Sequence, residues 1–326
     1  MKAWTVEAWC SPRDMKLADL PVPEPGPGEA LVRVHAAALN FFDVLMIGGK
    51  YQVKPPMPFT PGCEMAGEVV AAGPGSVFSP GDRVCSQPRW GAFGEYVLVE
   101  NDRTDRVPDG VPMRDAAVMP VVYPTAHVAL RRRGQLQAGE WVLVTAGAGG
   151  VGLAAIQLAR AWGGRVLALA GGPEKCAICR SHGAELALDY REDGWVDAVR
   201  AHTGDHGVDV IVDPVGGRVY DLALKILAWE GRAVIIGFAG GEIQRIAANR
   251  LLLKNASAVG AVWGGYLARD PARAREVVAD CFDLHARGAI RPAIMRTYGL
   301  ADLTDALEAL ASRETWGKLV VDMGVG

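Results

Sequence analysis

The stretch Trp141-Val-Leu-Val-Thr-Ala-Gly147-Ala-Gly149-Gly150-Val-Gly152-Leu-Ala-Ala-Ile-Gln-Leu-Ala159 passes from an apolar run through four glycines into a segment with apolar residues at helical spacing. This order predicts a strand, a tight turn and a helix, the first βα turn of a dinucleotide-binding domain. Gly147 permits the turn, Gly149 lets the backbone approach a pyrophosphate, and Gly152 lets the helix pack on the strand. Free N–H groups at the helix start favour a phosphate. We therefore predict dinucleotide binding at Gly147, Gly149, Gly150, Val151 and Gly152.

Residues 123 to 265 continue this alternation of apolar β segments and helical segments. Strands are expected at 141–145, 165–170, 186–189, 208–213, 231–236 and 257–262, and helices at about 150–162, 173–182, 194–203 and 219–227. Strands that alternate with helices imply a parallel, doubly wound sheet. The fold class is therefore α/β.

Residues 1 to 122 show a different sequence pattern, in which short β-rich segments are separated by clusters of Pro and Gly. The expected strands lie at 31–35, 67–71, 83–85 and 95–99. This pattern is typical of a mainly antiparallel, barrel-like domain. A helix near 271–287, a capped amphipathic helix at 302–310 and a strand at 318–321 follow the second domain, and we expect residues 266 to 326 to return to the first.

Composition excludes several classes of function. The net charge of −3 and a pI near 6.1 provide no basic field for nucleic acid. No run of about 20 apolar residues is present and the start lacks a signal-peptide core, so we expect a cytosolic protein without a membrane partner. Six scattered cysteines do not form a disulfide framework, and Cys176 and Cys179 are interpreted as helix-packed thiols.

An ordered set of motifs covers nearly the whole chain and resembles the medium-chain dehydrogenase/reductase superfamily, specifically its zinc-free, zeta-crystallin-like quinone oxidoreductase branch. The resemblance implies a GroES-like catalytic domain, a Rossmann domain, a cleft between them, and hydride transfer from a nicotinamide cofactor. The motifs that carry it are Asn40-Phe-Phe-Asp43, Tyr51, Pro61-Gly-Cys-Glu-Met-Ala-Gly67, Gly81-Asp-Arg-Val84, Gly94-Glu-Tyr-Val97, Tyr123-Pro-Thr-Ala126, the glycine turn and Gly317-Lys-Leu-Val-Val321.

No metal site is expected. Zinc alcohol dehydrogenases of the superfamily use a Cys in a C-x-x-D segment and a His in a G-H-E segment, where this chain has Asn40 and Cys63. Zinc needs three or four N, S or O ligands, so the loss of the first Cys and the His removes the set. We interpret Cys63 as a small buried residue. Without a Lewis acid, the chemistry suits an acceptor that takes hydride readily, such as a quinone or an activated alkene.

The preferred cofactor is expected to be NADPH. In NAD-preferring domains an acid about 20 residues after the glycines binds the ribose 2′-hydroxyl, but here the second strand ends in Gly171-Gly172-Pro173-Glu174-Lys175. A 2′-phosphate is not repelled there, and Lys175 can pair with it. By resemblance, Tyr190 borders the same phosphate. A solvated surface role for Lys175 remains the alternative.

The resemblance also implies the remaining site residues. Tyr51, Thr125 and Asn40 are the candidate catalytic residues, with Tyr51 on the acceptor side as an orienting group or proton donor and Thr125 near the nicotinamide. Solvent is an equally good proton source, and Thr125 can instead cap a helix. Further cofactor contacts are expected at Gly237, Phe238, Ala239, Val262, Trp263, Gly264 and Lys318.

The sequence therefore predicts an NADPH-dependent quinone oxidoreductase. Two alternatives stay open: a reductase of 2-enoyl thioesters or enones, and a catalytically idle NADPH-binding protein. The apolar segment 257–262 is the last strand expected in the sheet, and because family members pair this edge across a two-fold axis, we expect a homodimer.

Overall fold

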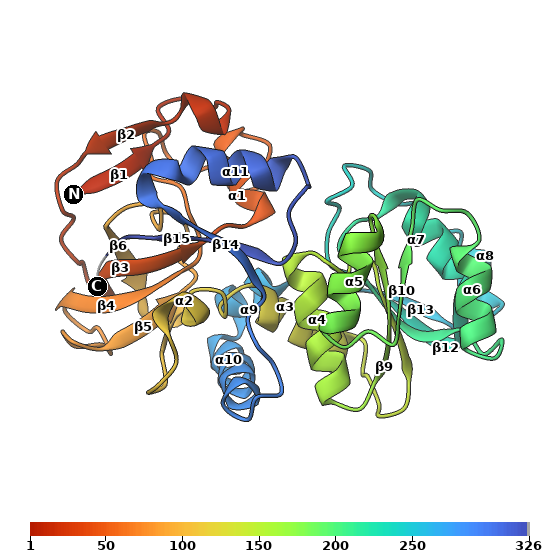
Figure 1. Cartoon of the computed structure of the whole chain (residues 1–326). Coiled ribbons are helices and arrows are strands. Elements are labelled where there is room, and N and C mark those ends of the chain that lie inside the picture. Colours follow the sequence, from red (N-terminus) through yellow and green to blue (C-terminus); the bar gives the residue numbers. More distant parts are fainter. Residues whose placement is uncertain (325–326) are drawn as a thin grey trace. The chain divides into compact units, whose positions relative to one another are not determined.

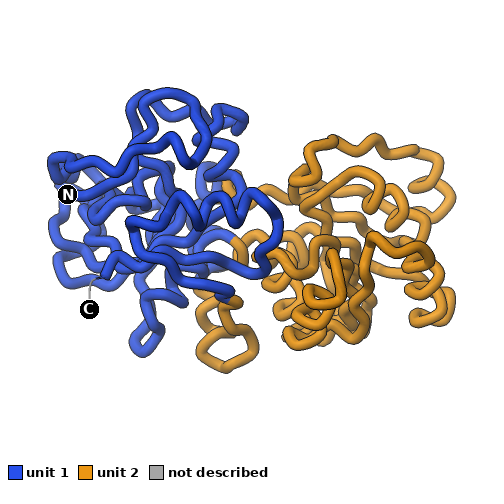
Figure 2. Tube along the Cα trace, turned by 45° about the horizontal axis from the view of Figure 1, so that its top comes forward, with its two compact units in different colours: residues 1–121, 267–278, 294–326 blue, residues 122–266, 279–293 orange. Residues whose placement is uncertain are grey.

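The computed structural model describes residues 1–324 and divides into two compact units (Figure 2). Unit 1 comprises Met1–Val121, Leu267–Val278 and Ile294–Gly326, and unit 2 comprises Val122–Tyr266 and Ala279–Ala293. The segment 279–293 thus departs from the expected return of the whole tail to the first domain. Hydrogen bonds hold it in unit 2, from His127 to Asp280 at 2.8 Å and from the Arg291 backbone N–H to Gln157 Oε1 at 2.6 Å.

Unit 1 is built on a seven-stranded sheet with the order β14-β15-β3-β4-β5-β7, with β6 also paired to β3. All of its pairs are antiparallel except β14 with β15. The strands are β3 (Glu29–Ala38), β4 (Met65–Ala72), β5 (Arg83–Ser86), β6 (Tyr96–Glu100), β7 (Thr104–Arg106), β14 (Ile294–Gly299) and β15 (Lys318–Asp322); β1 (Lys2–Thr5) and β2 (Lys16–Asp19) form a separate ribbon. The C-terminal strand therefore joins the N-terminal sheet within one unit.

The alternation of buried and half-exposed residues along the strands explains how the core of unit 1 forms. In β6, Val97 and Val99 are buried while their neighbours are half-exposed, as a strand with one covered face requires. In α11 (Leu303–Ala311), Leu303, Ala306 and Leu307 lie on one helical face and join the same core. Asp302 precedes α11 without a side-chain capping hydrogen bond, so the expected cap is absent. The other helices are α1 (Phe41–Ile47), α2 (Met113–Ala116), η1 (Pro12–Asp14), η2 (Asn101–Arg103) and η5 (Leu300–Asp302).

Unit 2 contains a six-stranded, fully parallel sheet with the order β10-β9-β8-β11-β12-β13. Its central strands are buried except at Asp209, as strands covered on both faces must be. The strands are β8 (Trp141–Val144), β9 (Arg165–Ala170), β10 (Leu186–Asp189), β11 (Val208–Asp213), β12 (Leu227–Ile235) and β13 (Ser257–Gly260).

Helices cover both faces of this sheet. Figure 1 shows α4 (Gly150–Ala161) and α5 (Pro173–Ser181) on one side of the strands and α6 (Trp195–His202) and α7 (Gly217–Ala223) on the other. The strand order reverses between β8 and β11, which is where ligands bind in doubly wound sheets. The remaining elements are α3 (Val122–His127), η3 (Val128–Arg133), η4 (Leu224–Ile226), α8 (Ala248–Leu252), α9 (Trp263–Arg269) and α10 (Pro271–Ala286).

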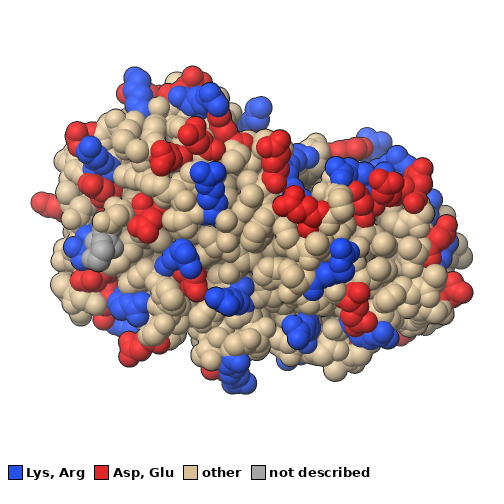
Figure 3. Space-filling view, viewed as in Figure 1, with Lys and Arg blue, Asp and Glu red and all other residues tan. Residues whose placement is uncertain are grey.

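The predicted fold class is confirmed, and the expected strands occur with small shifts at their ends. On the face drawn in Figure 3, acidic and basic side chains are interspersed. Among the described residues, no helix combines the length and apolar character needed to cross a membrane.

Candidate functional site

The glycine-rich turn follows β8 in unit 2 and is held by close contacts. A Cβ on Gly147 would lie 2.9 Å from the Ala168 side chain and 3.0 Å from Cys179 Sγ. A Cβ on Gly152 would collide with the carbonyl oxygens of Ala146 and Gly147. The left-handed backbone of the turn is at Ala146 (φ 47°), so Gly147 is required for packing rather than for its φ angle.

The N-terminus of α4 emerges directly from this turn. Gly149 is its N-cap in an extended conformation, and no described side chain caps the helix. The N–H groups of Gly150, Val151 and Gly152 precede the first helical hydrogen bond, which Leu153 makes to Gly149 at 2.8 Å. These donors at the positive end of the helix dipole suit a diphosphate.

A second group of candidate cofactor-binding residues lies at the carboxyl ends of β9 and β10. The Gly172 N–H donates to Asp189 Oδ2 at 2.8 Å, and Arg191 binds both oxygens of the same carboxylate. The Arg191 hydrogen bonds lower the pKa of Asp189 to about 2. Tyr190 leans over Gly171, whose added Cβ would lie 3.3 Å from the phenol oxygen. An acid does stand at this edge, but its charge is paired with Arg191.

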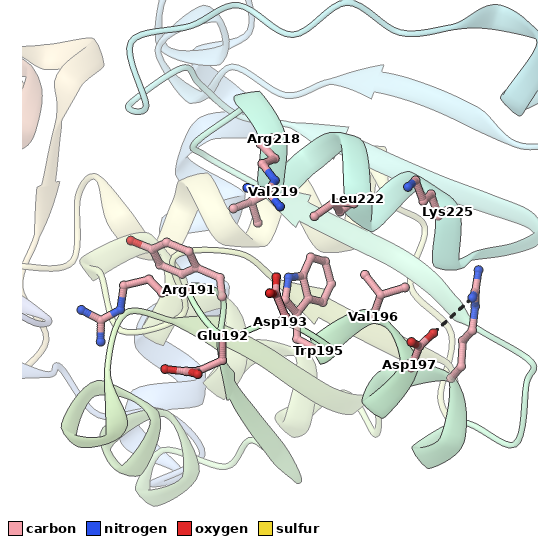
Figure 4. A pocket seen from close by; sticks show the side chains of 13 residues that line it. Arg191, Glu192, Asp193, Trp195, Val196, Asp197, Arg218, Val219, Leu222 and Lys225 are labelled. Atoms are coloured by element: carbon pink, nitrogen blue, oxygen red, sulfur yellow. Dashed lines mark hydrogen bonds and ion pairs between the residues drawn. The ribbon is translucent and has the colours of Figure 1, made fainter.

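A pocket of about 610 Å³ lies beside this group (Figure 4). One wall is the segment 190–197, which includes the buried Trp195, and the opposite wall comes from α7 and η4. Arg218 reaches from α7 toward the loop and forms no ion pair with any described residue. A free guanidinium beside an aromatic wall suits a ligand that is both planar and anionic.

Asp213 forms hydrogen bonds at the point where the strand order reverses. Its fully buried carboxylate accepts hydrogen bonds from Thr145 Oγ1, at the end of β8, and from the Gly216 N–H at 2.8 Å. Burial raises the pKa of Asp213. The ends of β8 and β11 are therefore tied together next to the glycine turn.

The other predicted cofactor residues of unit 2 also follow strands. Phe238 is 44% exposed after β12, and the Ala239 N–H donates to Pro214 O at 3.0 Å. After β13, Val262 is 62% exposed whereas Trp263 is buried at the start of α9. Thr125 lies in α3, which is buried along its length.

Unit 1 contains a buried ionic network around Asn40. Lys318 Nζ donates to Glu64 Oε2 at 2.8 Å, to Asn40 Oδ1 at 2.7 Å and to Leu39 O at 2.6 Å, so its three hydrogens are in use. Glu64 also accepts from Asn40 Nδ2 at 2.9 Å and from the Val121 N–H at 2.8 Å. Lys318 therefore orients Asn40 within unit 1.

Asp43 and Cys63 lie beside this network. Asp43 is fully buried, and its Oδ2 accepts the Asn40 N–H at 2.7 Å. Burial raises the pKa of Asp43 to about 7, opposed by that hydrogen bond and by Lys318. Burial and the Asp43 carboxyl together hold the pKa of the Cys63 thiol well above its ordinary value. Cys63 Sγ lies 3.1 Å from Arg89 O.

Tyr51 follows α1 and stacks on Phe42, with ring centroids 5.5 Å apart. It packs against the core cluster that contains Cys63. Burial raises the pKa of the Tyr51 phenol, and the neighbouring Cys63 and Asp43 raise it further. The phenol is therefore a weak acid that keeps its proton at neutral pH.

The residues around Cys63 do not fit a zinc ion. Glu64 is already bound by Lys318, Asn40 and Val121, and burial raises the pKa of the Cys63 thiol. Within residues 1–324, no group of three or more His, Cys, Asp or Glu side chains could hold a metal. A protein zinc site needs three or four Cys, His, Asp or Glu ligands, and the described side chains around Cys63 do not provide such a set.

Sequence reasoning did not assign roles to Asp189, Arg218, Glu64 and Asp43. The sequence did indicate a special role for Glu64, because an acid within the otherwise apolar run Cys63-Glu-Met-Ala66 is expected to be buried and to need a partner there. Arg218 had no local signal, since its place in the pocket depends on how α7 packs beside α6.

Known proteins resemble the chain over nearly its whole length. Residues 26–109 match the model described as "Alcohol dehydrogenase GroES-like domain", and residues 150–282 match "Zinc-binding dehydrogenase". The Quinone oxidoreductase-like protein 2 of Rattus norvegicus is 40% identical over 300 residues, which are 91% of this chain and 86% of the relative. The Quinone oxidoreductase of Homo sapiens is 34% identical over 74% of each chain.

Solved structures agree with this relationship. A mycobacterial protein in complex with NADPH has a TM-score of 0.91 at 33% identity, covering 99% of both chains. The quinone oxidoreductase of Escherichia coli, also in complex with NADPH, has a TM-score of 0.90 at 26% identity, covering 99% of this chain and 100% of that one. The chain therefore belongs to the medium-chain dehydrogenase/reductase superfamily, in the branch of the quinone oxidoreductases.

Proposed function

We propose that this protein is an NADPH-dependent oxidoreductase that reduces a quinone or an activated alkene without a metal ion. The observation that carries the proposal is the uncapped N-terminus of α4 at the glycine turn, next to the carboxyl end of β9, where Tyr190 lies over Gly171. Relatives solved in complex with NADPH support the choice of cofactor.

The residues of unit 2 fit this cofactor. The N–H groups of Gly150 to Gly152 suit the diphosphate, and Lys175 and Tyr190 suit the 2′-phosphate. Asp189 does not repel that phosphate, because Arg191 neutralises it. The pocket lined by Trp195 and Arg218 suits the adenosine end. When bound, NADPH supplies a hydride to the acceptor.

Other residues orient the reactants. Thr125 and the segment 237–239 position the nicotinamide end, and Tyr51 lines the acceptor side. Lys318 acts through Asn40, because its ammonium is fully bonded inside unit 1. Catalysis then depends on proximity and orientation. Simple alcohols are not expected to react, because the Asn40 and Cys63 positions offer no zinc ligand set to polarise them.

A panel of acceptors tests the proposal. NADPH absorbance is followed with 1,4-benzoquinone, 9,10-phenanthrenequinone, a simple enone and crotonyl-CoA, in the presence and absence of a chelator. Quinone turnover far above the other acceptors, unchanged by the chelator, is the expected result. A higher turnover with crotonyl-CoA than with the quinones would assign the enzyme to thioester reduction. If none of the four acceptors is reduced, only the role of an NADPH-binding protein remains. Activity that depends on about one zinc per chain contradicts metal-free catalysis.

A further inference from the structure

The acid at the carboxyl edge of the parallel sheet comes from the third strand of the nucleotide-binding order rather than from the second. In NAD-preferring domains, the acid that binds the ribose 2′-hydroxyl follows the second strand. Here the second strand, β9, ends at Ala170 without an acid, and Asp189 ends the third strand, β10. The parallel register places Asp189 opposite Ala170. The carboxylate therefore stands at the edge where a 2′-hydroxyl or a 2′-phosphate is to be recognised.

Both oxygens of the Asp189 carboxylate are taken by hydrogen bonds. Oδ2 accepts the Gly172 N–H at 2.8 Å and Arg191 Nη2 at 2.7 Å. Oδ1 accepts the Arg191 backbone N–H and Arg191 Nε, both at 3.0 Å. The hydrogen bond from the Arg191 side chain is the largest cause that lowers the pKa of Asp189 to about 2, so the carboxylate is ionised at neutral pH. Since a carboxylate offers about four acceptor positions, none remains for a ribose hydroxyl.

The Arg191 guanidinium lies on the turn that follows β9. A Cβ on Gly172 would be 2.8 Å from Arg191 Nη2, so the guanidinium packs directly on this glycine. Tyr190 lies on Gly171 in the same way, with an added Cβ 3.3 Å from the phenol oxygen. The two glycines, the phenol and the guanidinium thus form one compact group at the end of β9.

Arg191 keeps hydrogen-bond donors for a ligand. Its guanidinium has five N–H donors, and the donors on Nε and Nη2 point to Asp189. No acceptor within residues 1–324 binds its Nη1, and the side chain is 57% exposed. Figure 4 shows Arg191 at the end of the pocket that lies opposite Lys225. A planar guanidinium that is fixed on one side and open on the other suits the binding of a phosphate.

We propose, resting on the proposed function, that Asp189 and Arg191 form a pair that selects the 2′-phosphate of NADPH. Arg191 covers the charge of the carboxylate and offers its outer N–H groups to the phosphate, while Asp189 holds the guanidinium in place. NADH gains nothing from the pair, because Asp189 has no acceptor position left for the 2′-hydroxyl. Without Arg191, the same carboxylate would repel the phosphate and accept the hydroxyl, so Arg191 decides which cofactor this edge favours.

Measurements of binding test the pair without reference to turnover. Titration calorimetry at neutral pH gives the Kd of NADPH, NADH, 2′,5′-ADP and 5′-AMP for the wild type and for Arg191→Ala. The variant should raise the Kd of NADPH and of 2′,5′-ADP by about 50-fold or more, since loss of a charge-assisted hydrogen bond costs about tenfold to a hundredfold and the uncovered carboxylate adds repulsion. The Kd of NADH and of 5′-AMP should fall or stay within about threefold, because neither ligand carries a 2′-phosphate.

A double variant and a control separate the two contributions. Asp189→Asn combined with Arg191→Ala should recover at least about tenfold of the NADPH affinity that Arg191→Ala loses, because the repelling charge is gone. Arg165→Ala is the matched control, since Arg165 pairs with Glu185 at 3.1 Å at the amino ends of the same two strands. It should leave all four Kd values unchanged. Matching thermal unfolding curves establish that the variants are folded.

Three results would overturn the selecting pair. The first is an NADPH affinity of Arg191→Ala within about threefold of the wild type, which means that Arg191 does not bind the phosphate. The second is a double variant that binds NADPH no better than Arg191→Ala, which means that the carboxylate was not covered. The third is an equal wild-type affinity for 2′,5′-ADP and 5′-AMP. A wild type that binds NADPH selectively but reduces none of the acceptors contradicts the proposed function alone and leaves the pair intact.

Discussion

At the scale of single residues, Asp189 at the edge of the parallel sheet and the buried Asp43 show what local sequence does not reveal. The lack of an acid at the tip of β9 could be read from Gly171-Gly172-Pro173, but the role of Asp189 could not. Asp189 belongs to the next strand, and it reaches Gly172 only because β9 and β10 are neighbours in the sheet. Its pairing with Arg191 then determines the charge at this edge.

Changing Lys175 to Ala should reduce the preference for NADPH over NADH by about 1 kcal/mol or more, because one charge-assisted contact to the 2′-phosphate is lost. The measurement is kcat/KM with each cofactor at a saturating acceptor concentration. Since NADH lacks the 2′-phosphate, its kcat/KM serves as the internal control and should not change. Equal losses with both cofactors would show that Lys175 has no part in the selection.

Changing Asp43 to Asn should make stability less dependent on pH. The folded-state pKa of about 7 lies above the ordinary value of 3.8, so folding favours the protonated form, and the wild type loses stability as the pH rises across this window. From pH 4 to 7 the wild type should lose more than about 1 kcal/mol relative to the variant in the free energy of unfolding. Denaturant titrations at several pH values measure this difference, and Asp105, with a pKa of about 6, contributes equally to both proteins. Parallel curves would mean that Asp43 is ionised in the folded protein.

At the scale of elements, the sequence predicted those strands and helices whose periodicity is set by burial. The six strands of unit 2 and α4 to α6 lie where the apolar pattern placed them. Strand β14 was missed because it is a mostly exposed edge strand, with Arg296 and Thr297 facing solvent and no alternation of apolar residues. It exists through its parallel pairing with β15, which is a non-local interaction.

The turn between β8 and α4 provides a prediction at this scale. Gly152→Ala should destabilise the protein by about 1–3 kcal/mol and weaken NADPH binding, since the added methyl group meets the Ala146 and Gly147 carbonyl oxygens. Gly264→Ala is the matched control for stability, because it is also helical and its added Cβ meets no atom within 4 Å. Both variants gain up to about 1 kcal/mol of helix propensity, so their difference isolates the collision. If the thermal unfolding midpoint of Gly152→Ala is equal to or higher than that of Gly264→Ala, the close packing at Gly152 is refuted.

At the scale of the whole molecule, the sequence motifs predicted the family and the two-part architecture, whereas the assignment of residues 279–293 to unit 2 depended on tertiary hydrogen bonds. The open edge of the parallel sheet is the main unexplained surface. Strand β13 pairs with β12 alone, and Leu252 and Leu253 just before it are 80% and 75% exposed. An exposed edge beside apolar side chains favours association with a second copy.

We therefore predict a homodimer that pairs through β13. Val259→Lys should shift the light-scattering mass from two chains to one at micromolar concentration, because the added charge would be buried in the pairing. Val77→Lys in unit 1, at a position that is 55% exposed, is the control and should leave the mass at two chains. A wild-type mass of one chain would rule the dimer out.

We propose above all that this chain passes hydride from NADPH, in preference to NADH, to a quinone. The most direct measurement is kcat/KM of the metal-free wild-type protein for each cofactor, with 9,10-phenanthrenequinone as the acceptor. We expect acceptor-dependent NADPH oxidation with a kcat/KM about tenfold or more above that for NADH, which corresponds to about 1.4 kcal/mol. Equal use of the two cofactors, or no quinone-dependent oxidation of NADPH, would contradict it.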